Sequence, residues 1–175
     1  MKNFKKNKIG ILGGTFDPAH KGHIKISMKA KKKFHLDKVI WAITKKNPFK
    51  EKSYMSLKKR IIFAKKLSKK DNFIKIQFFE NKLKSNRILD LISYLRKKNQ
   101  NTDYYFIMGA DNLINFHKWH RWKKIISKCQ VLVFDRSRYK AKSLKSIAYK
   151  RFNKKGIEFI NLKKVNISSS QLRKI

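Results

Sequence analysis

Six short apolar runs recur along the chain, separated by stretches with a helical pattern. The runs are rich in β-branched and aromatic residues, as buried strands are, and they cover residues 8–14, 38–44, 73–77, 104–108, 129–134 and 157–160. Between them, apolar residues recur at the spacing of one helix face. The predicted helices span about 21–34, 56–67, 87–98, 112–127 and 142–152, and residues 168–174 could start another. This alternation predicts an α/β fold with a doubly wound, mostly parallel sheet covered on both faces.

The predicted elements form one unit. No repeat of fixed period and no linker rich in Gly or Ser divides the sequence, so residues 1–175 are predicted to form a single domain. In parallel sheets of this kind, ligands bind beyond the carboxyl ends of the strands, where the strand order reverses. The residues that directly follow strands are therefore the candidates for function.

The charge is extreme, with 47 Lys and Arg against 10 Asp and Glu and a formal net charge of +37. This balance favours an anionic ligand. The lysines are spread along the whole chain, however, and Lys, Ile, Asn and Phe, whose codons are rich in A and T, make up about half of it. A compositional bias of the genome explains the charge better than a dedicated nucleic-acid surface, which would gather Arg and aromatic residues in one stripe.

Cysteine content and hydropathy indicate the cellular location of the protein. The single cysteine, Cys129, cannot form an internal disulfide and is predicted to be a packed core thiol, which favours a reducing, cytoplasmic location. No run approaches the ~18 apolar residues of a membrane span, and the basic start lacks the apolar segment of a signal peptide. We expect neither a membrane nor a specific nucleic acid as partner, and a homo-oligomer stays open.

The turn after the first strand, residues 13–23, reads Gly-Gly-Thr-Phe-Asp-Pro-Ala-His-Lys-Gly-His. It is neither a dinucleotide fingerprint nor a P-loop. Gly13 and Gly14 let the backbone approach a ligand closely. His20 and His23, three residues apart at a helix start, share one face and suit a phosphate.

Two alternatives remain open in this turn. Asp17 is as well explained by a structural hydrogen bond to the turn as by contact with a ligand. His20 and His23 could also hold a metal, although no third ligand is adjacent.

Two later segments carry further candidates. Ser168 and Ser169 open a predicted helix, where they either cap it or leave backbone N–H groups for an anion, and Arg173 adds a planar donor. The strand at 104–108 ends at Gly109, so that Asp111 emerges at the ligand edge with Trp119 near it. The residues alone favour a core position for Trp119.

The turn resembles the hallmark of the nucleotidylyltransferase superfamily. Together with Gly-Ala-Asp-Asn-Leu at 109–113, Phe-His-Lys-Trp at 116–119 and Ile-Ser-Ser-Ser-Gln-Leu-Arg at 167–173, it makes essentially the whole chain resemble the nicotinate-nucleotide adenylyltransferases. The resemblance implies a Rossmann-like domain that transfers the adenylyl group of ATP to nicotinate mononucleotide, with Mg²⁺ as cofactor. A pantetheine-phosphate adenylyltransferase or a cytidylyltransferase would share the turn but not the segment at 109–119.

The resemblance also assigns roles to residues. His20 and His23 would be catalytic, and the ATP-binding set would be Gly13, Gly14, Thr15, Phe16, His20, His23, Ser168, Ser169 and Arg173. The acceptor-binding set would be Lys50, Asp90, Gly109, Asp111 and Trp119, with Asp111 also next to the metal. The cations expected to matter are protonated His20 and His23, Lys50 and Arg173.

The chain departs from the family pattern at two places. Asn-Pro-Phe-Lys at 47–50 lacks the histidine of the usual Pro-Pro-His-Lys. Residues 88–92, Ile-Leu-Asp-Leu-Ile, lack both threonines of Thr-x-Asp-Thr-Leu, which removes one expected side-chain contact to the nicotinate pocket. The sequence leaves the choice between nicotinate and nicotinamide mononucleotide open. The chain ends two residues after Arg173, so a shortened C-terminal helix is expected.

Overall fold

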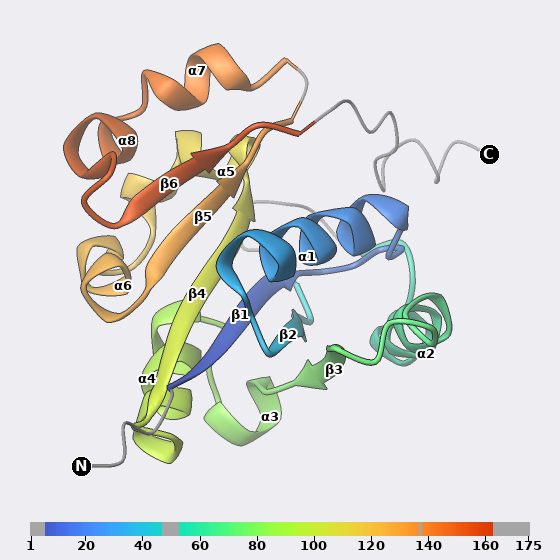
Figure 1. Cartoon of the computed structure of the whole chain (residues 1–175). Helices are drawn as coiled ribbons and strands as arrows, with labels where there is room; N and C mark the ends of the chain where they lie inside the picture. The colour runs from blue at the N-terminus through green and yellow to red at the C-terminus, as the bar shows by residue number, and fades with distance from the viewer. Residues whose placement is uncertain (1–5, 47–52, 137, 163–175) are drawn as a thin grey trace.

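A computed structural model describes residues 6–46, 53–136 and 138–162 (Figure 1). Its six strands are all parallel and form one sheet in the order β3-β2-β1-β4-β5-β6. The strands are β1 (Asn7–Gly14), β2 (Lys38–Ile43), β3 (Ile74–Phe78), β4 (Thr102–Gly109), β5 (Gln130–Phe134) and β6 (Ile157–Ile160). The predicted doubly wound α/β fold is confirmed, and the strand order reverses between β1 and β4.

Helices cover both faces of the sheet because its strands are apolar on both sides. On one face, α1 (Lys21–Phe34) and α2 (Leu57–Leu67) bury Ala30 and Ala64 against β1, β2 and β3. The other face is covered by α4 (Ile88–Lys98), α5 (Ala110–Ile114), the 3₁₀ turn η1 (Phe116–Lys118), α6 (Trp122–Lys128) and α8 (Ile147–Phe152). The two short remaining helices are α3 (Glu80–Leu83) and α7 (Lys140–Leu144).

The predicted helix at 112–127 is wrong as a single element. The structure divides it into α5, η1 and α6, with Arg121 in the left-handed region at φ 48°. A continuous helix turns about 100° per residue, which would set Phe116 and Ile125 on opposite sides. In the structure both side chains are fully buried in the same core. The breaks between α5, η1 and α6 turn the chain so that both can face it.

Two smaller differences concern α3 and the segment at 142–152. The α3 helix was not predicted, because four residues are too few for a periodic signal. The predicted helix at 142–152 is split by Ser146, whose extended backbone starts α8 and whose hydroxyl accepts the Tyr149 N–H. Cys129 is buried as predicted, and burial raises the pKa of its thiol to about 12.

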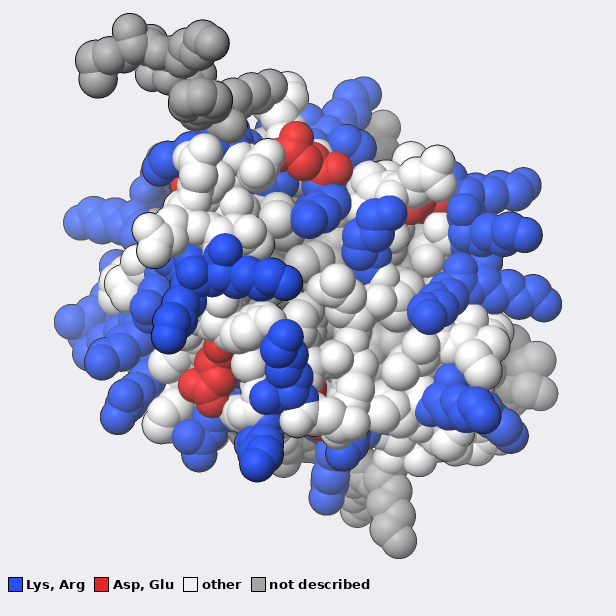
Figure 2. Space-filling view, turned by 90° about the horizontal axis from the view of Figure 1, so that it is seen from below, with Lys and Arg blue, Asp and Glu red and all other residues white. Residues whose placement is uncertain are grey.

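The basic side chains are distributed as the sequence indicated. Figure 2 shows Lys and Arg scattered over one face with few acidic groups among them. Within the described residues only three ion pairs form, so most of these cations have no acidic partner there. No helix in the described ranges has the length and apolar character needed to cross a membrane.

Candidate active site

The turn at 13–23 leaves the carboxyl end of β1, which pairs with β2 on one side and β4 on the other. It therefore lies where the strand order reverses, the position at which doubly wound sheets bind ligands. Gly13 and Gly14 end β1 and line a cavity there. A Cβ on either glycine would make only ordinary contacts of 3.6 Å or more, so the fold itself tolerates a side chain at both positions.

His20 and His23 cap the start of α1 in a reciprocal arrangement. His20 Nδ1 accepts the Gly22 N–H at 3.1 Å, and His23 Nδ1 accepts the His20 N–H at 3.1 Å. Because each Nδ1 is an acceptor, the proton of each neutral ring is assigned to Nε2. The ring centroids lie 3.9 Å apart, which gives two neighbouring N–H donors at a helix N-terminus.

The electrostatics of this pair differ from the sequence expectation. Burial lowers the pKa of His20 to about 4, with a smaller contribution from the Arg136 charge. The pKa of His23 lies well below 6.5, mainly through burial and then through His20. Both directions favour neutral rings in the free protein near pH 7, so the cationic role expected of the pair when protonated has no support there.

Aromatic packing and one hydroxyl hold the His23 ring. Phe16 stacks on Trp41 with centroids 5.0 Å apart and contacts the His23 ring at 4.7 Å. Ser27 accepts the Trp41 Nε1–H and donates to the His23 carbonyl, both at 2.8 Å. Phe16 is only 2 % exposed, so any contact of Phe16 with ATP falls to its backbone.

Arg60, which sequence reasoning missed, joins the loops that follow β1 and β2. Its guanidinium donates to the carbonyls of Thr15, Thr44 and Lys45, and to Met55 just before α2. The side chain is buried, which lowers the pKa of its guanidinium, and the charges of Asp17 and Glu80 offset part of that effect. The available signal was its position: Arg60 lies on the apolar stripe of α2, three residues after Leu57.

Asp17, for which the sequence left a structural and a ligand-binding role open, makes structural hydrogen bonds. Its carboxylate is buried and accepts the N–H groups of Tyr54 at 2.6 Å and Met55 at 2.8 Å. Asp17 and Arg60 thus hold the same short segment, one through its N–H groups and the other through the Met55 carbonyl.

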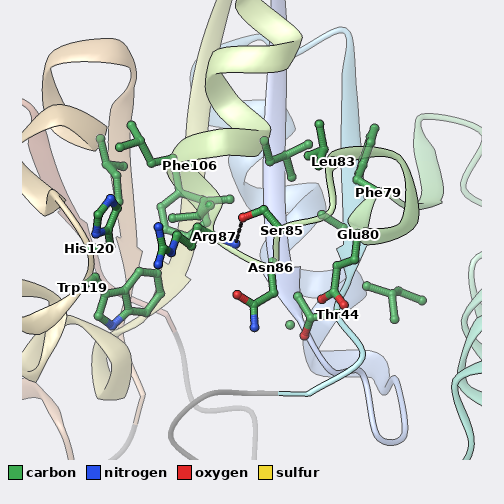
Figure 3. Close-up of a pocket in the computed structure, with 18 of the residues that line it drawn as sticks. Thr44, Phe79, Glu80, Leu83, Ser85, Asn86, Arg87, Phe106, Trp119 and His120 are labelled. Carbon is green, nitrogen blue, oxygen red and sulfur yellow. Dashed lines mark hydrogen bonds between the residues drawn. The ribbon is translucent and has the colours of Figure 1, made fainter.

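A cavity of about 320 Å³ opens beside the turn, between the ends of β1, β2 and β4 and the wall formed by α3, α4 and η1. Most of its lining is apolar, including Phe79, Leu83, Leu89, Phe106 and Trp119 (Figure 3). The Trp119 ring packs on Phe106 and Phe116, with centroids 6.1 and 5.3 Å away. Trp119 thus packs in the core and also lines the cavity. The core position expected from the residues alone is therefore compatible with the acceptor-binding role that the resemblance implies. Such a lining suits a flat ring.

Gly109 and Asp111 meet Arg136 at the carboxyl ends of β4 and β5. Asp111 Oδ2 accepts Arg136 Nη1 at 2.7 Å. Asp111 Oδ1 is buried and has no hydrogen-bond partner among the described residues. A Cβ on Gly109 would lie 2.5 Å from this oxygen, so a side chain there would require the Asp111 carboxylate to move. Sequence reasoning missed Arg136, although it comes two residues after the end of β5, just as Asp111 comes two residues after the end of β4.

The remaining predicted residues divide into two groups. Asp90 lies in α4, where it accepts the Ser85 hydroxyl at 2.6 Å. The other four predicted residues lie outside the described ranges: Lys50, Ser168, Ser169 and Arg173. His120 lines the cavity together with Trp119.

The metal prediction can be compared with the available donors. In the described part of the chain no three His, Cys, Asp or Glu side chains gather closely enough to hold an ion. A cation such as Mg²⁺ is commonly held by one or two carboxylates together with substrate phosphates and water. Two buried carboxylate oxygens of the described residues, Asp111 Oδ1 and Asp135 Oδ1, have no hydrogen-bond partner, and Asp111 is the predicted metal neighbour.

Comparison with known proteins gives consistent matches. The model of the cytidylyltransferase-like protein family matches residues 11–175 of this chain. A probable nicotinate-nucleotide adenylyltransferase of Pelagibacter ubique is 65% identical over 173 residues, covering 99% of this chain and 96% of that protein. One from Bradyrhizobium sp. (strain ORS 278) is 38% identical over 130 residues, covering 74% of this chain and 67% of the relative.

Solved structures agree in fold. The Plasmodium falciparum nicotinic acid mononucleotide adenylyltransferase complexed with NaAD superposes with a TM-score of 0.74 at 19% identity, covering 96% of this chain and 83% of that one. A structure of the same Plasmodium protein complexed with APC has the same TM-score, identity and coverage. At this identity the likeness shows that the fold is shared.

Proposed function

The chain belongs to the cytidylyltransferase-like family, among the nicotinate-nucleotide adenylyltransferases, and we propose that it transfers the adenylyl group of ATP to nicotinate mononucleotide. The products are nicotinate adenine dinucleotide and pyrophosphate, a step of NAD biosynthesis. One observation at the candidate active site supports the proposal. Gly13 and Gly14 line the apolar cavity and also begin the turn that carries the histidine pair to the start of α1, so a phosphate-binding turn leaves the edge of a ring-binding pocket.

The chemistry needs no general base. The 5′-phosphate of the acceptor is already anionic, so one of its oxygens attacks the α-phosphorus of ATP directly. That P–O bond forms as the bond to the oxygen bridging the α- and β-phosphates breaks, and the electron pair leaves with pyrophosphate. Catalysis then reduces to alignment and to stabilisation of charge on the transferred phosphoryl group.

His20 and His23 are suited to that stabilisation. Their Nε2–H groups are the free donors, because each Nδ1 is occupied by a backbone N–H. Rings that are neutral in the free protein still donate, and their burial strengthens each hydrogen bond to an anionic oxygen. Thr15, Ser168, Ser169 and Arg173 are proposed as further contacts to the ATP phosphates.

The acceptor is assigned to the cavity. We place the pyridine ring on Trp119, and we assign Asp111 to the ribose and Gly109, Asp90 and Lys50 to the surrounding contacts. The mostly apolar wall and the aromatic packing at Trp119 support this placement. A Mg²⁺ ion near Asp111 would bind phosphate oxygens and neutralise part of their charge, which is the one contribution expected of it.

We also propose a cytoplasmic location, which the single buried thiol supports, and no specific nucleic-acid partner.

Pyrophosphate release in the presence of ATP and Mg²⁺ tests the function. The protein is assayed with nicotinate mononucleotide, nicotinamide mononucleotide and phosphopantetheine as separate acceptors. We expect release with the first and none with phosphopantetheine. Inactivity with nicotinate mononucleotide would overturn the proposal, and omission of Mg²⁺ tests the cofactor separately.

A further inference from the structure

We propose that Arg87 recognises the carboxylate of the nicotinate ring, and that this residue makes the chain prefer the acid over the amide. The inference rests on the proposed adenylyl transfer and concerns the choice of acceptor within it. Four observations carry it: where Arg87 lies, how its backbone is held, the absence of an ion pair to it among the described residues, and two cavity positions after it without side-chain donors.

Arg87 directly precedes α4 and lines the cavity together with Trp119 and His120. In Figure 3 its side chain points toward these two residues, while Ser85 and Asn86 lie on its other side. A ring lying against Trp119 would therefore present its substituent within the region that the guanidinium occupies.

A hydrogen-bonded turn holds the base of the Arg87 side chain. The Arg87 N–H donates to Ser85 Oγ at 3.1 Å, and the Ser85 hydroxyl donates to Asp90 Oδ2 at 2.6 Å. The Arg87 carbonyl accepts the N–H groups of Asp90 and Leu91, which begins α4. The start of the side chain is thus fixed relative to the cavity wall.

Among the residues that the structure describes, no ion pair neutralises the charge of Arg87. Glu80 is the acidic residue on the cavity wall, and its carboxylate accepts the Lys45 N–H at 3.0 Å. A planar guanidinium without an ion pair in the described ranges, beside an apolar ring pocket, suits a planar carboxylate that can accept two parallel hydrogen bonds.

Two cavity positions after Arg87 carry no side-chain donor. Ile88 and Leu91 stand where the family pattern has threonines, and both line the cavity. Neither side chain can donate a hydrogen bond. Arg87, directly before Ile88, brings a charged donor to the same wall, and its charge discriminates between a carboxylate and a neutral carboxamide.

The test compares kcat/KM for nicotinate and nicotinamide mononucleotide at saturating ATP in the wild type and in Arg87→Gln, Arg87→Lys and Lys118→Gln. Lys97→Gln is the matched control, because it removes one positive charge from the exposed far end of the same helix. We expect Arg87→Gln to lower kcat/KM for the acid about tenfold or more while the value for the amide stays within about twofold. Arg87→Lys should keep part of the preference.

Each other outcome overturns the inference. A parallel fall for both acceptors would mean that Arg87 only supports the fold, and no change for either would mean that it does not meet the substrate. A collapse of the preference in Lys118→Gln but not in Arg87→Gln would assign the role to Lys118, which also lines the cavity. A wild type that is active but prefers the amide defeats the inference alone, whereas a wild type inactive with both acceptors defeats the proposed function.

Discussion

The phosphate turn at 13–23 and the acceptor wall formed by α3, α4 and η1 meet at one cavity but are built differently. The turn is held by hydrogen bonds through His20, His23, Asp17 and Arg60, and its aromatic support is buried. The acceptor wall combines the short elements α3 and η1 with the start of α4, and polar residues on it, such as Arg87 and Lys118, are exposed.

The difference corresponds to two tasks. Stabilising charge on a transferred phosphoryl group requires donors fixed before the substrate arrives, because reorganisation during the reaction would raise the barrier. Choosing between acceptors requires only a few contacts that discriminate one group. We therefore expect substitutions in the turn to lower kcat. Substitutions in the wall should instead change the KM for the acceptor or the preference between acceptors.

The largest effect is expected from the histidine pair. His20→Ala or His23→Ala removes one preorganised donor, and kcat should fall by about 10²- to 10³-fold with little change in the acceptor KM. Steady-state pyrophosphate release measures both constants. His35→Asn serves as control, because His35 is exposed and its left-handed backbone (φ 54°) suits asparagine. Near wild-type kcat in both alanine variants would contradict the role.

A smaller effect is expected in the wall. Trp119→Leu should raise the KM for nicotinate mononucleotide about tenfold, because a stacked ring loses its partner, while the KM for ATP should stay unchanged. Trp122→Leu is the matched control, since Trp122 packs on Phe116 and Phe152 instead of lining the cavity. If Trp122→Leu raises the KM for nicotinate mononucleotide as strongly as Trp119→Leu does, the proposed contact between Trp119 and the acceptor ring is contradicted.

The smallest effect concerns stability as a function of pH. The folded pKa of His20 lies near 4, below the 6.5 of an unfolded histidine, so the unfolded chain binds more protons as the pH falls from 6.5 toward 4. The free energy of unfolding should therefore decrease over this window. His20→Asn, which keeps a capping side chain, should weaken the decrease.

Urea midpoints at pH 7.5 and pH 5 measure this effect, with the two proteins compared at each pH. An equally steep loss of stability in His20→Asn would contradict the assigned cause.

Prediction from sequence succeeded where the signal was local. The six strands follow from apolar runs, and the turn follows from glycines and histidines within eleven consecutive residues. The neutral state of His20 could not be foreseen, because burial and Arg136, more than one hundred residues away, cause it. Arg60 was missed for the same reason: its partners Thr15 and Thr44 lie in other loops.

The guanidinium of Arg60 has one further consequence. Loops that close on a ligand normally lose conformational entropy when they bind it, and that loss weakens affinity. Here the carbonyls of Thr15 and Thr44 are already immobilised by one buried side chain, so much of this ordering accompanies folding. The two substrates then meet loops whose relative position is set in advance, and more of their binding free energy remains for alignment of the reacting oxygen and phosphorus.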